Sequence, residues 1–226
     1  MSSLIKELLN KTSYSFYDLT EIMKILRSEN GCPWDREQNH KTIRKNFIEE
    51  TYEVCEAIDN NDAEGLKEEL GDVLLQVVFH SRISEEAEEF SIDNVIDGIC
   101  KKLIYRHPHI FGSVNVSGAE DVLKNWDALK KVEKNQKTFS DVLNAVPKTL
   151  PALMYAFKLS DKALKNKVEF DSVVKSNIVE FDDDINDEKI GEILFVLVSK
   201  CRNAGIDPEK ALYDYCRKFI DDFSNK

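Results

Sequence analysis

Four acidic side chains in the first half of the chain have types and spacing suited to metal chemistry. Glu50 and Glu53 lie in one stretch of helical pattern, and Glu69 and Asp72 lie in the next. Three residues is almost one helical turn, so both members of a pair project from the same side. Carboxylates brought together repel one another and lose hydration unless cations join them. Because carboxylate oxygens suit magnesium or manganese, the spacing predicts a divalent-metal site.

Helix geometry gives the two acidic pairs matching positions. Glu50 and Glu69 each lie about 60° from the centre of an apolar stripe, and Glu53 and Asp72 lie about 120° away. An antiparallel hairpin turning at residues 60–62 would bring the pairs together. A single acidic run is usually a solvated face, but two matched pairs on adjacent helices favour a site. The stripes expected to be buried are Phe47, Thr51, Val54 and Ile58 on one helix, and Leu66, Leu70, Val73, Val77 and Ser84 on the next.

The elements that must position these acids are predicted to be helices, and the fold class to be all-α. Gly and Pro are few and fall between helical patterns, and strand-like alternation is nearly absent. Residues 1–118 are expected to form a first domain, 119–146 a helical connector and 147–226 a second domain. Helices are expected at 16–28, 42–60, 63–88, 92–106, 119–136, 151–166, 180–204 and 208–223.

Composition bounds the function class. The 226 residues carry a formal net charge of −11, so no basic excess exists to bind a nucleic-acid polymer or an anionic membrane. No apolar run approaches the length of a membrane span. Five scattered cysteines without a Cys-x-x-Cys pair, and no secretory signal, indicate reduced thiols in a cytoplasmic protein. Neither a P-loop nor a Rossmann glycine pattern occurs.

The two halves of the chain have similar segments. Residues 188–198 repeat the pattern of residues 68–78, with Gly191 at the place of Gly71 and Arg202 in the register of Arg82. Further on, residues 216–218 match residues 100–102 after a small deletion. This order favours a tandem repeat. Since a glycine inside a helix costs about 1 kcal/mol relative to alanine, Gly71 predicts a close approach by a neighbouring helix or a ligand.

The chain resembles the MazG family, the nucleoside triphosphate pyrophosphohydrolases of the all-α NTP-pyrophosphatase superfamily. The resemblance is carried by residues 31–38 (Gly-Cys-Pro-Trp-Asp-Arg-Glu-Gln), by the paired acidic motif and by residues 106–112 (Arg-His-Pro-His-Ile-Phe-Gly). It covers nearly the whole chain. It implies tandem helical-bundle domains that dimerise into four-helix-bundle-type assemblies. It also implies Mg²⁺ dependence, with Mn²⁺ as an alternative, and hydrolysis of NTPs and dNTPs to the monophosphate and pyrophosphate.

The resemblance assigns roles to particular residues. The family's metal positions fall on Glu50, Glu53, Glu69 and Asp72, and Glu49 falls on the extra glutamate of the motif, as a base or a residue behind the metal ligands. These five form the expected catalytic set. Expected substrate contacts are Trp34, stacking on a base or anchoring its loop, and Arg82, Lys102 and Arg106, as phosphate contacts or solvated surface cations.

The second repeat departs from the family pattern. Lys189 stands at the position of Glu69 and Glu192 at that of Asp72, and the nearest further acids are Glu180 and residues 182–184. A lysine ammonium repels the cation that such a cage would hold, so the first repeat is expected to be the active one. The expected chemistry is metal-assisted attack of water on the α-phosphorus, with Glu49 or Glu53 taking the proton.

Alternatives to this function remain open. A di-iron carboxylate bundle needs paired Glu-x-x-His motifs, and only Glu37 with His40 fits. His107 and His109 suggest zinc less strongly than loop packing. A catalytically weakened nucleotide sensor or interaction protein is the main rival to an enzyme of nucleotide-pool housecleaning or stress response.

Overall fold

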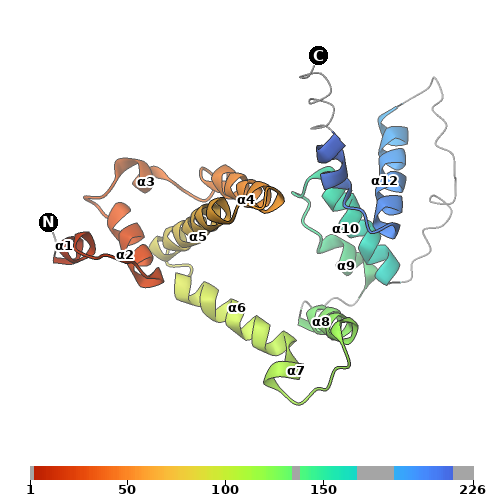
Figure 1. Cartoon of the computed structure of the whole chain (residues 1–226), viewed down its shortest axis with the longest axis horizontal. Helices are drawn as coiled ribbons and strands as arrows, with labels where there is room; N and C mark the ends of the chain where they lie inside the picture. The colour runs from red at the N-terminus through yellow and green to blue at the C-terminus, as the bar shows by residue number, and fades with distance from the viewer. Residues whose placement is uncertain (1–2, 134–137, 167–185, 216–226) are drawn as a thin grey trace. The chain divides into compact units, whose positions relative to one another are not determined.

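The computed structural model describes residues 3–133, 138–166 and 186–215, and in this part of the chain every regular element is a helix (Figure 1). The all-α prediction is therefore confirmed. The chain divides into two compact units between Ser117 and Gly118. The first unit holds α1 (Ser3–Leu9), α2 (Phe16–Leu26), α3 (Pro33–Glu37), α4 (Arg44–Asp59), α5 (Ala63–Glu86), α6 (Ile92–Arg106) and α7 (Pro108–Phe111).

The second unit holds α8 (Ala119–Glu133), α9 (Phe139–Asn144), α10 (Ala152–Lys165) and α12 (Asp187–Asn203), and residues 208–215 are also helical. The residues expected to form a connector, 119–146, belong to this unit, where α9 packs on α10. The eight helices expected from the sequence are present wherever the structure describes their residues. The short helices α1, α3, α7 and α9 were not expected, because so few residues give no clear periodicity.

The hairpin between α4 and α5 turns at residues 60–62, as predicted. Asn61 adopts a left-handed backbone conformation with φ of 55°, which asparagine tolerates better than most residues. Asp62 then caps α5, since its Oδ1 accepts a hydrogen bond from the Gly65 backbone N–H at 3.0 Å. The turn sets α4 and α5 side by side in the most extensive helix–helix interface of the first unit (Figure 1).

The core of the first unit forms around the C-terminal half of α5. Its buried members are Met23, Ile43, Val78 and Phe79. All buried residues of α5 lie between Gln76 and Ser84. The N-terminal half of α5, which carries the acids, is therefore more open to solvent.

The predicted burial of the apolar stripe is largely wrong for α4, whereas in the α5 stripe only Leu70 is exposed and Ser84 is fully buried. Phe47 is 36% exposed, Ile58 54% and Leu70 51%, and the only buried residue of α4 is Ala57. Periodicity identifies an apolar side of a helix but does not say whether the same chain covers it. No neighbouring helix of the described residues makes the close approach predicted at Gly71, and the approach of a ligand there stays a prediction. A Cβ atom added there, or at Gly191, would meet nothing within 4 Å.

Helices α10 and α12 pack together in the second unit, and α12 buries the same positions as α5. Val196, Val198 and Ser199 are buried, and they follow Gln76, Val78 and Phe79 of α5 by 120 residues (196 − 76 = 120). Ser160 Oγ donates to Ser199 Oγ at 3.1 Å across the interface. The matching burial is consistent with the repeat. Residues 216–218, Glu180 and residues 182–184, which also entered that comparison, lie outside the described residues.

Candidate metal centre

Three carboxylates from α4 and α5 converge beside the hairpin. One oxygen from each of Glu50, Glu69 and Asp72 lies within 4.8 Å of the other two, and all three residues are partly buried. The hairpin explains this convergence. Glu50 precedes the turn and the other two follow it, so antiparallel packing brings them level. The two matched pairs on the sequence thus produce a shared cluster.

The electrostatics of the cluster show that its negative charges are crowded. Burial, then a hydrogen bond with Glu53, then the charges of Asp72, Glu53 and Glu69 raise the pKa of Glu50 to about 7. The pKa of Glu69 is also raised, by burial first and then by the charges of Glu53 and Asp72. A bound cation would relieve both effects. Because the donors are all carboxylate oxygens, the site fits a hard divalent cation such as Mg²⁺ or Mn²⁺.

Glu53 and Glu49 occupy different places relative to the cluster. Glu53 is exposed, yet it lies close enough to Glu50 and Glu69 to raise the pKa of both. The structure therefore brings three of the four predicted metal ligands within 4.8 Å of one another and leaves Glu53 at the exposed edge of the cluster. Glu49 is exposed one residue away, about 100° around α4 from Glu50, and it is not among the three converging residues.

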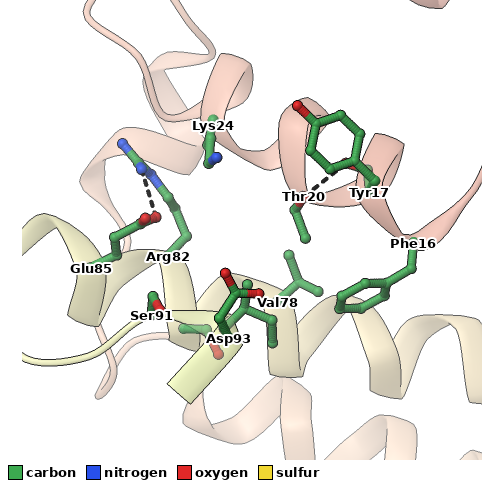
Figure 2. A pocket seen from close by; sticks show the side chains of 11 residues that line it. Phe16, Tyr17, Thr20, Lys24, Val78, Arg82, Glu85, Ser91 and Asp93 are labelled. Carbon is green, nitrogen blue, oxygen red and sulfur yellow. Dashed lines mark hydrogen bonds and ion pairs between the residues drawn. The ribbon is translucent and has the colours of Figure 1, made fainter. Parts of the chain in front are cut away.

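Arg82 lies away from the cluster. It follows Asp72 by ten residues (82 − 72 = 10), which is about 15 Å along the axis of α5. Its Nη1 pairs with Glu85 at 2.8 Å and its Nε with Glu86 at 2.9 Å. Figure 2 shows its side chain beside a cavity of about 210 Å³, which Phe16, Tyr17 and Lys24 of α2 and the start of α6 also line.

The other predicted substrate contacts lie on α3 and α6, and not on the two helices that carry the cluster. Trp34 lies in the short helix α3 and not in a loop, and its side chain is 56% exposed. Lys102 is exposed on α6, and Arg106 is buried at the end of that helix. Ile92, at the start of α6, packs against the core, so Lys102 is about 15 Å further along the axis and Arg106 about 21 Å.

The sequence interpretation missed a contact between His40 and His80. Their Nδ1 atoms are 2.7 Å apart, although 40 residues separate them. The available signal was His80 itself, because this histidine directly follows the apolar residues 77–79 on α5. Among the described residues, one group of three potential metal ligands lies close enough to share an ion, and it consists of Glu50, Glu69 and Asp72. No such group in the described residues includes His40, His107 or His109, as a zinc or di-iron site would require.

The crowding of the carboxylates leads to a testable result. We expect Glu50→Gln to raise the melting temperature in EDTA by a few degrees, because a neutral amide removes one of the repelling charges. The same change should reduce the rise in melting temperature that Mg²⁺ produces, because a ligand is lost. Thermal unfolding at about pH 8, with EDTA and with Mg²⁺, measures both effects.

The matched control is Glu56→Gln, which removes an exposed charge from α4 outside the cluster. It should change neither the free energy of unfolding in EDTA nor the stabilisation by Mg²⁺ by more than about 0.5 kcal/mol. An equal loss of stability in Glu50→Gln with and without the metal would contradict a cation site.

No helix among the described residues is both long and apolar enough to cross a membrane.

Fold and site together define a class: an all-helical protein with a carboxylate cluster suited to a divalent cation. Comparison with known proteins identifies the family. The model of the MazG nucleotide pyrophosphohydrolase domain matches residues 38–111, which include the whole cluster.

Two relatives match along most of both chains. The nucleoside triphosphate pyrophosphohydrolase/pyrophosphatase MazG of Thermotoga maritima is 39% identical over 221 residues, covering 92% of this chain and 84% of that protein. The nucleoside triphosphate pyrophosphohydrolase of Escherichia coli K12 is 35% identical over 217 residues, covering 89% and 82%. The chain therefore belongs to the MazG family and carries its nucleotide pyrophosphohydrolase domain.

Two further matches are shorter. The uncharacterized protein YabN of Bacillus subtilis is 50% identical over 146 residues, but the chain spans only 30% of that protein's length. The crystal structure of a mazG-related protein from Thermotoga maritima aligns with a TM-score of 0.44 and 28% identity. That alignment covers 51% of this chain and 98% of the other.

Proposed function

We propose that this protein hydrolyses nucleoside triphosphates and deoxynucleoside triphosphates to the monophosphate and pyrophosphate, with Mg²⁺ bound by Glu50, Glu53, Glu69 and Asp72. The observation that carries the proposal is the convergence of Glu50, Glu69 and Asp72 within 4.8 Å. The names of the Thermotoga maritima and Escherichia coli relatives support the reaction. Mn²⁺ would serve as an alternative metal, since it shares the preference for oxygen ligands.

In the proposed mechanism the protein supplies position and charge. Glu50, Glu69 and Asp72 would hold the cation, and the chemistry it would supply is neutralisation of phosphate charge and acidification of a water molecule. Glu53, which is exposed and adjoins Glu50 and Glu69, would either complete the ligand set or take the proton of the attacking water. Glu49, further from the cluster, is a second candidate for that proton. No covalent enzyme intermediate is required.

The substrate contacts and the dimer belong together in this proposal. Trp34, Lys102 and Arg106 lie on other helices than the cluster, and in the proposed dimer they and Arg82 contact a nucleotide bound to a second copy of the chain. A homodimer is supported by the exposed apolar residues of α6, because a second copy of the chain would cover them. These residues, at helical spacing, are Val95, Ile96, Ile99 and Leu103. Sedimentation of the intact chain measures the oligomeric state.

The active repeat in the proposal is the first one, residues 1–118, and the second, residues 147–226, is degenerate. Lys189 is partly buried on α12 at the position of Glu69, where its ammonium would repel a cation. This lysine also favours a second candidate function, that of a weakened nucleotide sensor. Nucleotide binding without turnover would distinguish it. For the active enzyme, the proposed role is cytoplasmic housecleaning of the nucleotide pool or a stress response.

Product analysis tests the reaction directly. Incubation with a panel of NTPs and dNTPs should release the monophosphate and pyrophosphate in equal amounts with Mg²⁺, and almost nothing in EDTA. Ion-exchange chromatography of the nucleotides and an orthophosphate assay separate the outcomes. Release of orthophosphate as the first product would place the cleavage at another phosphorus and contradict the proposal.

A further inference from the structure

His40 and His80 form a close pair outside the acidic cluster. His40 lies in the segment before α4, and His80 lies on α5. The planes of the two rings are 2° from parallel, their centroids are 5.1 Å apart and their Nδ1 atoms are 2.7 Å apart, so the rings meet edge to edge. At that distance one Nδ1 must donate a proton and the other must accept it. The pair thus requires one hydrogen between the two atoms.

The surrounding hydrogen bonds decide which ring donates. Ser84 Oγ donates to Glu89 Oε2 at 3.2 Å and lies 3.2 Å from His40 Nε2. Because the hydroxyl has a single proton, Ser84 accepts from His40, so His40 carries its hydrogen on Nε2. A neutral His40 then has a bare Nδ1, which accepts from the Nδ1–H of His80. The chain of bonds runs in one direction from His80 to Glu89.

This arrangement admits one extra proton but not two. A proton added at Nε2 of His80 leaves the bond between the Nδ1 atoms in place. If both rings become imidazolium, two N–H groups and two positive charges face each other at 2.7 Å, and the contact cannot survive. Burial, and then the charge of His40, lower the pKa of His80 below its ordinary value of 6.5. The electrostatics therefore agree with the geometry.

The pair holds together the elements that carry the acids. The ring of Phe47 on α4 meets the ring of His80 edge-on, with centroids 5.9 Å apart. Glu50 lies three residues after Phe47, on the same side of α4. Between His40 and Phe47, Ile43 is buried in the core. Contacts at His80 therefore fix the start of α4 against α5, one turn from the carboxylate cluster.

We propose that His40 and His80 are positioning residues for the carboxylate cluster, acting as a latch that holds the start of α4 on α5 until both rings are protonated. In the unfolded chain each ring binds its proton independently. The folded latch resists the second proton, so its contribution to stability is complete above about pH 6.5 and is lost as the pH falls below that value. The effect on turnover rests on the proposed function, whereas the latch itself does not.

The other charged groups near the latch do not change their charge between pH 7.5 and pH 5, so the pH dependence comes from the two histidine rings. Glu89 reaches it only through Ser84, which is fully buried. At the end of α2, Arg27 is paired with Glu86 and donates to the Gln38 carbonyl. The positive charge of Arg27 and the negative charge of Glu86 do not change between pH 7.5 and pH 5. On the segment itself and the start of α4, Lys41, Arg44 and Lys45 are exposed cations that also remain charged.

The test is nitrogen-15 NMR of the histidine rings, together with hydrogen exchange of the amides of residues 39–47, from about pH 7.5 to pH 5. At the upper pH we expect His80 as the Nδ1–H tautomer and His40 as the Nε2–H tautomer. The second proton should bind at least about tenfold more weakly than the first. Protection of residues 39–47, corrected for intrinsic exchange, should fall by at least about tenfold as it binds.

Variants separate the latch from general stability. His80→Phe keeps an aromatic ring against Phe47 but has no Nδ1. His40→Gln changes the exposed histidine of the pair instead, and it serves as the test if His80→Phe folds poorly. Both should lose the pH-dependent change in protection. His107→Gln, in the chain's other histidine pair, should retain it. In the wild type, kcat should fall with the protection, while KM changes less.

Each outcome bears on one proposal. Rings that titrate independently near pH 6.5, or a change in protection that persists in both His80→Phe and His40→Gln, would overturn the latch. A normal latch transition in a protein that releases no pyrophosphate at any pH would overturn the proposed function and leave the latch standing.

Discussion

Asp72→Asn is expected to reduce Mg²⁺-dependent turnover by at least about 100-fold with the helical fold retained. The amide has the shape of the carboxylate but lacks its charge, so it binds a hard cation weakly. A catalytic metal contributes several kcal/mol of transition-state stabilisation, and each ~1.4 kcal/mol is a factor of ten in rate. Steady-state kinetics over a range of Mg²⁺ concentrations measures the loss, and circular dichroism checks the fold.

The matched control for Asp72 lies in the second unit. Glu192 occupies the equivalent place on α12 and is exposed, and no cation cluster involving it occurs among the described residues. Glu192→Gln should therefore leave the rate within about twofold of wild type. Wild-type turnover in Asp72→Asn would remove the cluster from the mechanism. A large loss in Glu192→Gln would move the active site to the second repeat.

Arg27→Met is expected to cost about 3 kcal/mol of stability, or about 6–12 °C in melting temperature. The guanidinium is almost completely buried, at 6% exposed, and it binds Glu86 with both Nε and Nη2. Its Nη1 also donates to the carbonyls of Asp35 and Gln38, which ties α3 and the following segment to α2. Methionine keeps much of the packing but leaves Glu86 and both carbonyls without these donors.

The pH dependence of this effect has a definite sign. Burial acts to raise the pKa of Glu86, but the hydrogen bonds and charge of Arg27, aided by Arg82, outweigh it, and the net pKa is lowered. The stabilisation is therefore complete above the ordinary value of 4.5 and is lost as the pH falls through the lower value of the folded state. The stability gap between wild type and Arg27→Met should narrow in acid.

Arg36→Met is the control for a basic residue in the same segment. Arg36 donates to the Glu29 carbonyl at 2.7 Å but is exposed to water, which replaces a lost hydrogen bond. Its loss should cost no more than about 0.5 kcal/mol. If denaturant unfolding gives equal costs for the two arginines, the buried ion pair does not anchor the segment.

Much of the acidic site could be predicted from the sequence because its geometry is local. The members of each pair share a helix, and the turn at residues 60–62 carries its own signals in Asn61 and in the cap Asp62. Helix periodicity and one tight turn therefore suffice to bring Glu50 level with Glu69 and Asp72. The side-chain positions were needed to show that Glu53 raises the pKa of Glu50 on its own helix and of Glu69 on the next.

Prediction failed where contacts join residues far apart in the chain. Nothing local indicates that His40 meets His80, since the contact depends on how the segment before α4 returns to α5. The apolar stripe of α4 was placed correctly on its helix, but the chain leaves much of it exposed. The same limit applies to Arg82, whose helix was predicted although its partners Glu85 and Glu86 and its neighbouring cavity were not.

By itself, the sequence determined the helical class, the long helices and their hairpin, and the pairing of acids that suits a hard cation. Backbone hydrogen bonds and side-chain spacing within a few residues are sufficient for these features. Only the tertiary structure decided which apolar faces are covered and which acidic side chains the basic residue Arg82 contacts. It also decided that His40 and His80 meet beside the start of α4. These depend on packing between distant segments, which no local pattern encodes.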